Sequence, residues 1–173
     1  MKRLILLGAG GFGRTVADAA AQTGVYESIH FLDDNAQGPA ILGPCNTFAN
    51  FADENTEFYP AFGNNEGRLN WIERLQAAGC HVASVIHPKA YVSPTARLGA
   101  GTVILPMATV NTCCRLEAGC IINCGAVVDH DCVLEAGVHI CLGAIVKAEN
   151  RIGRCMKIEA GQIIMNRTYP LGT

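Results

Sequence analysis

The sequence predicts an α/β domain with a parallel sheet, followed by a parallel β-helix built from three-sided coils. Two observations carry this prediction. From residue 85 to residue 168 an aliphatic residue recurs at every sixth position, whereas in residues 2–82 strand-like runs alternate with helical ones. The composition changes near residue 82, so the chain of 173 residues divides best into two domains, 1–82 and 83–173.

The second domain consists of fourteen consecutive hexads, from VIHPKA at Val85 to IIMNRT at Thr168. The second place of every hexad is aliphatic, and neither a helix nor a simple alternation produces a period of six. Each hexad therefore reads as one short strand and one tight corner. The second-place residues are Ile86, Val92, Leu98, Ile104, Val110, Leu116, Ile122, Val128, Leu134, Ile140, Val146, Ile152, Ile158 and Ile164.

Three hexads close one coil of eighteen residues, so that each aliphatic residue stacks on its counterpart in the next coil. The coils then hydrogen-bond to one another as parallel strands. Between four and five coils give roughly 20 Å of prism at the ~4.8 Å spacing of strands. Periodicity alone does not determine the hand of the coil.

Composition and charge exclude several classes of function. The net charge is −2 and no basic run is present, which argues against nucleic acid and anionic membranes as partners. The first apolar run, residues 4–7, is too short for a signal peptide or a membrane span. The nine cysteines lack paired CxxC spacing, so we expect reduced thiols in a cytoplasmic protein. Cys114, Cys120 and Cys132 fall at small inward places of the hexads and are expected to pack there.

A glycine-rich turn joins the first predicted strand to the first predicted helix. Residues 2–7 read as a buried strand, residues 12–23 as a helix, and Gly8, Gly10 and Gly13 form G-x-G-x-x-G at their junction. Such glycines let the backbone approach a phosphate at the helix N-terminus. The alternative is a tight turn whose glycines serve steric needs alone.

Two acidic residues follow the next predicted strand, residues 28–32. Asp33 and Asp34 end that strand about twenty residues after the glycine motif. Carboxylates at this place suit the donors of a ribose or a base. The sequence therefore predicts a nucleotide site at the carboxyl ends of the first two strands.

The rest of the N-terminal domain contains two further strands and one helix. We expect the strands at residues 57–62 and 81–86, the helix at residues 66–78, and irregular chain at residues 36–56. Roughly 80 residues amount to one mononucleotide-binding half, whereas a dinucleotide fold joins two halves. This favours a nucleotide linked to another group over NAD.

His130 is the candidate catalytic residue of the prism. In its hexad, VVDHDC, Val128 and Cys132 take the inward places, so His130 and Asp131 should project outward from the corner. An imidazole accepts a proton near neutral pH, and a carboxylate partner, Asp131 or Asp129, fixes its tautomer and raises its basicity. The alternative is a solvated histidine without a catalytic role.

Ala148 lies eighteen residues after His130 and therefore one coil above it. Its backbone N–H is expected one strand spacing from the imidazole, where it would polarise a thioester carbonyl. His139 falls on another face of the coil, so we do not expect a metal shared by the two histidines of one subunit.

The order of these motifs resembles the sugar acetyltransferases of the NeuD and PglD type. GAGGFG, FLDD, AFGNNEGR and INCGAVVDHDCVLEAGVHICLGA follow one another over nearly the whole chain to about residue 160, and DHDC and HICLGA are the most specific pieces. The resemblance implies a Rossmann-like nucleotide-binding domain followed by a left-handed parallel β-helix of hexapeptide repeats. It also implies a homotrimer with acetyl-CoA along the prism between neighbouring subunits, and a sugar or nucleotide-sugar held by the N-terminal domain.

The resemblance further implies roles for individual residues. His130 resembles the family's general base and Asp131 the acid that makes it more basic, in a mechanism without a metal. The residues that fall at the acetyl-CoA site are His139, Ala148 and Ala160. The residues that fall at the sugar site are Gly10, Gly11, Phe12, Asp33, Asp34, Gly63 and Asn64.

The second domain departs from the family pattern. The family usually has glycine where Ala148 stands and proline where Leu142 stands, and it continues for further coils beyond Thr173. We therefore expect a β-helix that is shortened at its C-terminus. Arg167 and Pro170 would then guard the open end against pairing with other strands.

The resemblance implies acetyl transfer from acetyl-CoA to the amine of a nucleotide-linked amino sugar, in the synthesis of a glycan, O-antigen or sialic-acid-type precursor. The nearest alternative is O-acetylation of a sugar such as sialic acid. A second alternative is a non-catalytic nucleotide-sugar-binding protein without a complete coenzyme A site. A trimeric hydratase with an interfacial metal is disfavoured because no close pair of histidines spans a coil.

Overall fold

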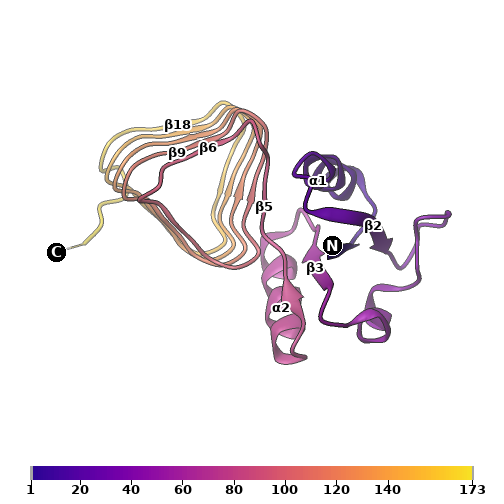
Figure 1. Ribbon diagram of the computed structural model, residues 1–173. Helices are drawn as coiled ribbons and strands as arrows, with labels where there is room; N and C mark the ends of the chain where they lie inside the picture. Colours follow the sequence, from indigo (N-terminus) through magenta and orange to yellow (C-terminus); the bar gives the residue numbers. More distant parts are fainter. Residues whose placement is uncertain (1, 173) are drawn as a thin grey trace.

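The computed structural model describes residues 2–172 as an α/β domain packed against a triangular prism of stacked coils (Figure 1). The N-terminal domain has a four-stranded parallel sheet of order β2-β1-β3-β4. Its elements are β1 (Lys2–Leu7), α1 (Gly11–Ala21), β2 (Tyr26–Leu32), a 3-10 helix (Cys45–Phe51), β3 (Thr56–Pro60), α2 (Asn65–Ala77) and β4 (His81–Val82).

The first three strands and both helices agree with the sequence prediction to within a few residues, and two regions differ. Both helices occur where they are expected, and Asn64 caps α2 by accepting a hydrogen bond from the Gly67 N–H at 2.7 Å. The region predicted to be irregular contains the 3-10 helix. The single strand predicted for residues 81–86 is wrong. The Ala83 N–H donates to Phe58 in the N-terminal sheet, whereas the Val85 N–H donates to Thr102 in the prism, so the chain changes sheet between them.

The prism consists of fourteen two-residue strands in three parallel sheets. We name each sheet after its first strand: the β5 sheet (β17-β14-β11-β8-β5), the β6 sheet (β18-β15-β12-β9-β6) and the β7 sheet (β16-β13-β10-β7). The strands are β5 (Val85–Ile86), β6 (Tyr91–Val92), β7 (Arg97–Leu98), β8 (Val103–Ile104), β9 (Thr109–Val110), β10 (Arg115–Leu116), β11 (Ile121–Ile122), β12 (Val127–Val128), β13 (Val133–Leu134), β14 (His139–Ile140), β15 (Ile145–Val146), β16 (Arg151–Ile152), β17 (Lys157–Ile158) and β18 (Ile163–Ile164).

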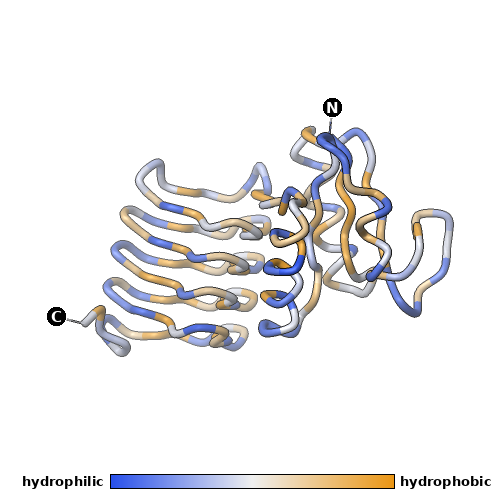
Figure 2. Tube along the Cα trace, turned by 90° about the horizontal axis from the view of Figure 1, so that it is seen from below, coloured by the Kyte–Doolittle hydropathy of each residue, from blue (hydrophilic) through white to orange (hydrophobic). Residues whose placement is uncertain are grey.

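The second-place residues of the hexads form the core of the prism, as predicted. Ile122 pairs with Ile104 on one side and with Ile140 on the other, a register of eighteen residues that repeats throughout the stack. From Ile104 onward these residues are buried, whereas Ile86 in the first coil is 39% exposed because no complete coil covers it. Figure 2 shows the coils as stacked layers. Burial of each such side chain stabilises the fold by about 1.5–3 kcal/mol.

All nine cysteines are free thiols. Cys114, Cys120 and Cys132 are buried in the prism core, as predicted, and burial raises the pKa of the Cys120 thiol to about 12. No helix within residues 2–172 combines the length and the apolar character that a membrane span requires.

The N-terminal domain contacts the prism through α2, which lies along the corner between the β7 and β5 sheets. Glycines at this corner allow the close approach, because a Cβ at Gly119 would lie 2.7 Å from a methyl group of Leu69. Arg68 is completely buried there. Its guanidinium donates to the backbone oxygens of Gly119 and Gly137, each at 2.9 Å, and thereby joins the helix to two successive coils.

Replacement of Arg68 by Met should lower the free energy of unfolding by about 2–4 kcal/mol, because buried carbonyl oxygens lose their donor. Arg154→Met is the matched control. Arg154 also joins the prism to α2, but through a half-exposed ion pair with Glu73 at 3.8 Å, and its loss should cost less than ~1 kcal/mol. Urea denaturation measures both values, and equal losses would contradict this account of the contact.

Candidate active site

His130 and Asp131 lie at the corner of the prism between β12 and β13. The Nδ1 atom of His130 is 2.7 Å from the Oδ2 atom of Asp131, and both side chains are half exposed, at 49% and 51%. Both therefore project outward, as the sequence predicts. The sequence left Asp129 and Asp131 open as partners of the imidazole, and in the structure the partner is Asp131.

The backbone around this pair is held from two sides. Asp129 accepts a hydrogen bond from the His130 N–H at 2.8 Å, and the Asp131 N–H donates to the backbone oxygen of Thr112 in the coil below at 2.9 Å. Asp131 has a φ of 56°, in the left-handed region, where several other corners of the prism carry glycine. Aspartate enters this region more readily than most non-glycine residues, so the corner can carry a carboxylate there.

The acidic neighbours make His130 a stronger base. The hydrogen bond with Asp131 raises the pKa of the imidazole above its ordinary value, and the charges of Asp129 and Glu149 act in the same direction. When Nδ1 carries the proton shared with Asp131, Nε2 is the atom that accepts a proton from a bound molecule.

Ala148 lies directly above His130 in the next coil. The N–H of the following residue, Glu149, donates to the backbone oxygen of His130 at 3.2 Å. Ala148 itself is 1% exposed, so its backbone is screened from bulk water. A donor in such a setting stabilises a developing negative charge more strongly than one in water.

The backbone N–H of Ala148 has no hydrogen-bond acceptor within residues 2–172. At some equivalent places of the prism the N–H is occupied: that of Ala136 donates to the carboxylate of Glu117, nineteen residues earlier, at 3.0 Å. At others within residues 2–172, such as Thr112 and Leu142, the N–H has no acceptor, as at Ala148. The residue nineteen positions before Ala148 is Asp129, but its carboxylate accepts from the His130 N–H instead. The corner therefore combines an outward imidazole with an unused amide one coil above it.

The other two residues expected at acetyl-CoA lie away from this corner. His139 is on β14 in the β5 sheet, 8% exposed, with Nε2 at 3.2 Å from the Asn123 amide and its ring 6.5 Å from that of Phe12. Burial lowers the pKa of His139 to about 4, helped by the positive charge of Arg68. Ala160 is exposed at the corner between β17 and β18.

The glycine motif forms a close turn between β1 and α1. A Cβ at Gly13 would lie 2.1 Å from the backbone oxygen of Gly8, so this glycine is required for close packing of α1 on β1. Gly10 and Gly11, by contrast, have open space where a side chain would be. Gly10 is the N-cap of α1 and no side chain caps the helix, so its first N–H groups are available to an anion.

The two acidic residues after β2 support the surrounding loops. Asp33 accepts hydrogen bonds from the N–H groups of Ala9 and Ala36, both at 2.7 Å, which lower the pKa of its carboxyl group. Asp34 accepts from the Cys45 N–H at 2.8 Å. Both carboxylates thus fix the loop geometry beside the glycine motif, and their contact with a ribose or a base stays a prediction.

The second loop that is predicted to contact substrate, Gly63 and Asn64, follows β3 at the same edge of the sheet. It lies next to the glycine motif, because a Cβ at Gly8 would be 3.2 Å from the ring of Phe62. The side-chain oxygen of Asn64 is used by the helix cap described above, whereas Gly63 has open space around it. The sheet therefore brings the predicted substrate residues together at one edge.

One chain does not bring these residues to His130. The N-terminal domain packs on the β5 sheet through α1 and on the adjoining corner through α2. His130 stands at the corner between the β6 and β7 sheets, which is the corner farthest from that domain (Figure 1). Within residues 2–172, no cluster of three His, Cys, Asp or Glu side chains is arranged to hold a metal ion.

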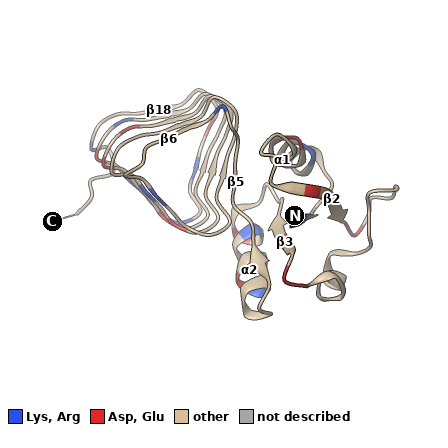
Figure 3. Cartoon of the chain, in the orientation of Figure 1, with Lys and Arg blue, Asp and Glu red and all other residues tan. Residues whose placement is uncertain are grey.

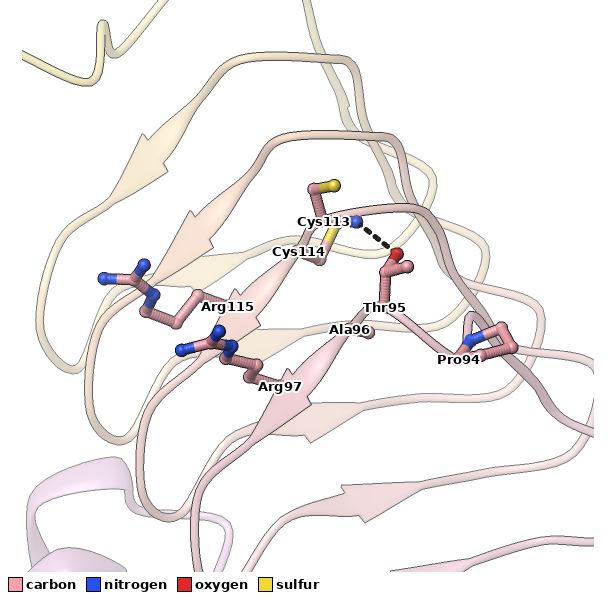
Figure 4. Close-up of a pocket in the computed structure, with 7 residues that line it drawn as sticks. All are labelled: Pro94, Thr95, Ala96, Arg97, Cys113, Cys114 and Arg115. Atoms are coloured by element: carbon pink, nitrogen blue, oxygen red, sulfur yellow. Dashed lines mark hydrogen bonds between the residues drawn. The ribbon is translucent and has the colours of Figure 1, made fainter.

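A groove that sequence reasoning missed begins one coil below His130. It has a volume of about 490 Å³ and contains Arg97 and Arg115, which lie in register on β7 and β10 (Figure 4). The signal was present in the sequence as two arginines at the first place of their hexads, eighteen residues apart.

Comparisons with known proteins bear on both halves of the chain. Residues 3–75 match the PglD N-terminal domain family. The acetyltransferase domain of PglB from Neisseria gonorrhoeae FA1090 is 38% identical with a TM-score of 0.93, over 96% of this chain and 84% of that one. The same domain has been solved in complex with acetyl coenzyme A, with a match over 96% of this chain and 83% of that one.

A more distant structure shares the fold. PerB from Caulobacter crescentus, solved in complex with CoA and GDP-perosamine, is 24% identical with a TM-score of 0.83, over 96% of this chain and 90% of that one. The prism is thus the left-handed β-helix that the motifs imply. With 38% identity over 84% of the PglB acetyltransferase domain, this chain belongs to the hexapeptide-repeat sugar acetyltransferases and is an acyltransferase of that family.

Proposed function

We propose that the protein transfers the acetyl group of acetyl-CoA to the amino group of a nucleotide-linked amino sugar, with His130 as general base. The observation that carries the proposal is the 2.7 Å pair of His130 and Asp131 beside the unused N–H of Ala148. The acetyl-CoA complex of the PglB domain supports the donor, and the GDP-perosamine complex of PerB supports the class of acceptor.

The chemical steps use groups at a single corner. The amine attacks the thioester carbonyl carbon while Nε2 of His130 removes its proton, and Asp131 stabilises the imidazolium that forms. The oxyanion of the tetrahedral intermediate accepts a hydrogen bond from the Ala148 N–H. The C–S bond then breaks, the thiolate of coenzyme A leaves, and the imidazolium returns the proton to the sulfur. These steps need no metal.

The proposed site is shared between subunits of a homotrimer. The β6 sheet and its corner with the β5 sheet expose apolar side chains that a second copy would cover: Tyr91 at 54%, Met107 at 68%, Leu142 at 55% and Ile163 at 55%. These surfaces adjoin the His130 corner on one side and the glycine motif on the other. A neighbour packed on the β6 sheet would therefore bring its own glycine motif toward His130.

In this trimer the two domains have separate roles. Residues 1–82 hold the nucleotide-sugar through the loops after β1, β2 and β3, and residues 83–173 carry the acyl-transfer groups. The substrate contacts are Gly10, Gly11, Phe12, Asp33, Asp34, Gly63 and Asn64. Acetyl-CoA contacts Ala148 in the subunit that supplies His130, and His139 and Ala160 in the neighbour.

Replacement of His130 by Ala should lower kcat by about 100-fold or more, because the attacking amine loses its base. Thr112→Ala is the matched control, since Thr112 occupies the same place one coil below and is also exposed. The assay incubates the protein with acetyl-CoA and a panel of UDP- and GDP-linked amino sugars and detects the acetylated sugar by mass spectrometry. Unchanged turnover of the His130 variant would remove His130 from the mechanism.

Replacement of Ala148 by Pro removes the proposed oxyanion donor and should lower kcat by about 100- to 1,000-fold. Proline is compatible with this place of the hexad, because Pro88, Pro94 and Pro106 occupy it in earlier coils. Ala148→Gly keeps the N–H and should retain activity. Thermal denaturation checks that both variants are folded, and a fully active, folded proline variant would refute the role of this amide.

A further inference from the structure

The groove below His130 is lined by two consecutive coils at the same corner of the prism. Pro94, Thr95 and Ala96 form one wall, and Cys113 and Cys114 form the wall above it. The Thr95 hydroxyl accepts a hydrogen bond from the Cys113 N–H at 3.0 Å, which ties the two walls together (Figure 4). The volume of about 490 Å³ is large enough for part of a substrate rather than for a single ion.

Two positive charges face this groove without a partner. Arg97 and Arg115 are paired in register on adjacent parallel strands, and their guanidinium groups extend to the same side (Figure 4). Neither forms an ion pair with a carboxylate within residues 2–172. Like charges directly opposite each other on neighbouring strands are destabilising. An anion bound between the two guanidinium groups would relieve that repulsion.

A third arginine of the same sheet shows how such a charge is neutralised when it is structural. Arg151 lies on β16, two coils above Arg115, and its guanidinium is 3.1 Å from the carboxylate of Glu135. Figure 3 shows basic segments on the β7 sheet, the side of the prism that contains neither of the labelled strands β5 and β6. Of the three arginines at this register position of the β7 sheet, Arg97 and Arg115 are therefore the two that are free to bind an external anion.

The groove is placed to orient a substrate at His130. The Asp131 N–H donates to Thr112 at 2.9 Å, so the wall formed by Cys113 is directly below the catalytic pair. Arg115 and Arg97 then lie on the first and second coils below the coil of His130, at roughly 5 and 10 Å along the prism.

We propose that Arg97 and Arg115 bind the diphosphate group of a substrate of the transfer reaction. This inference rests on the proposed function. Guanidinium groups recognise phosphate oxygens in bidentate geometry, and two of them match the two phosphoryl groups of a diphosphate ester. Both the nucleotide-linked sugar and coenzyme A carry that chemistry. The groove fixes the phosphoryl end, so that the reacting end reaches the His130 corner.

The test compares the double variant Arg97→Gln/Arg115→Gln with Arg151→Gln. Titration calorimetry with inorganic pyrophosphate is done in the Gly11→Glu background, so that the glycine motif contributes no binding. It should show affinity about tenfold weaker or worse for the double variant, and unchanged affinity for Arg151→Gln. The kinetic comparison uses the same variants without Gly11→Glu. Steady-state kinetics then identifies the source. A rise in KM for the nucleotide-linked sugar alone assigns the groove to the acceptor, and a rise in KM for acetyl-CoA alone assigns it to the donor, with kcat less affected in either case.

The inference is overturned if pyrophosphate binds the double variant as tightly as the protein with Gly11→Glu alone, or if Arg151→Gln weakens binding equally. Both results are independent of acetyl transfer, because calorimetry reads binding to the protein without turnover. A protein that binds pyrophosphate through these arginines but acetylates no sugar would refute the proposed function and leave the groove assignment standing.

Discussion

The closure of eighteen residues into one three-sided coil is the constraint on which the rest of the structure depends. It fixes every residue of the prism relative to its counterparts one coil above and below, because a strand pair such as Val128 with Val146 allows only one register. Ala148 is above His130 and Thr112 is below it for this reason alone. The geometry of the candidate site is therefore a consequence of core packing rather than of local loop conformation.

The same regularity explains how the two domains fit together. The prism presents a column of glycines at the corner that α2 covers, and Arg68 connects that helix to two coils through backbone oxygens rather than through carboxylates. Because backbone oxygens repeat at the coil spacing, a single guanidinium reaches two of them. This contact sets the position of the loops after β1, β2 and β3 relative to the prism, on the side opposite His130.

The sequence predicts those features that depend on periodicity, and fails where partners are distant in the chain. The hexads predict the coils, the core and the outward place of His130. They do not predict that strand 81–86 divides at Ala83, since that depends on which sheet offers the next carbonyl oxygen. The burial of Arg68 cannot be predicted from the sequence either, because arginine is ordinarily exposed. Arg97 and Arg115 are not predicted either, because they occupy outward places of their hexads, and only the inward places follow a regular pattern.

In the proposed trimer, His130 acts on a substrate held by a neighbouring subunit. The direct test denatures His130→Ala and Gly11→Glu, each of which we expect to be inactive, and refolds them together. Gly11 has room for a side chain, so the Glu side chain blocks the predicted phosphate site without a clash. A site shared between subunits restores activity to roughly a quarter of the unaltered value, because mixed trimers contain sites with both intact halves. If the mixture is as inactive as each variant alone, the site lies within one chain and the account is contradicted.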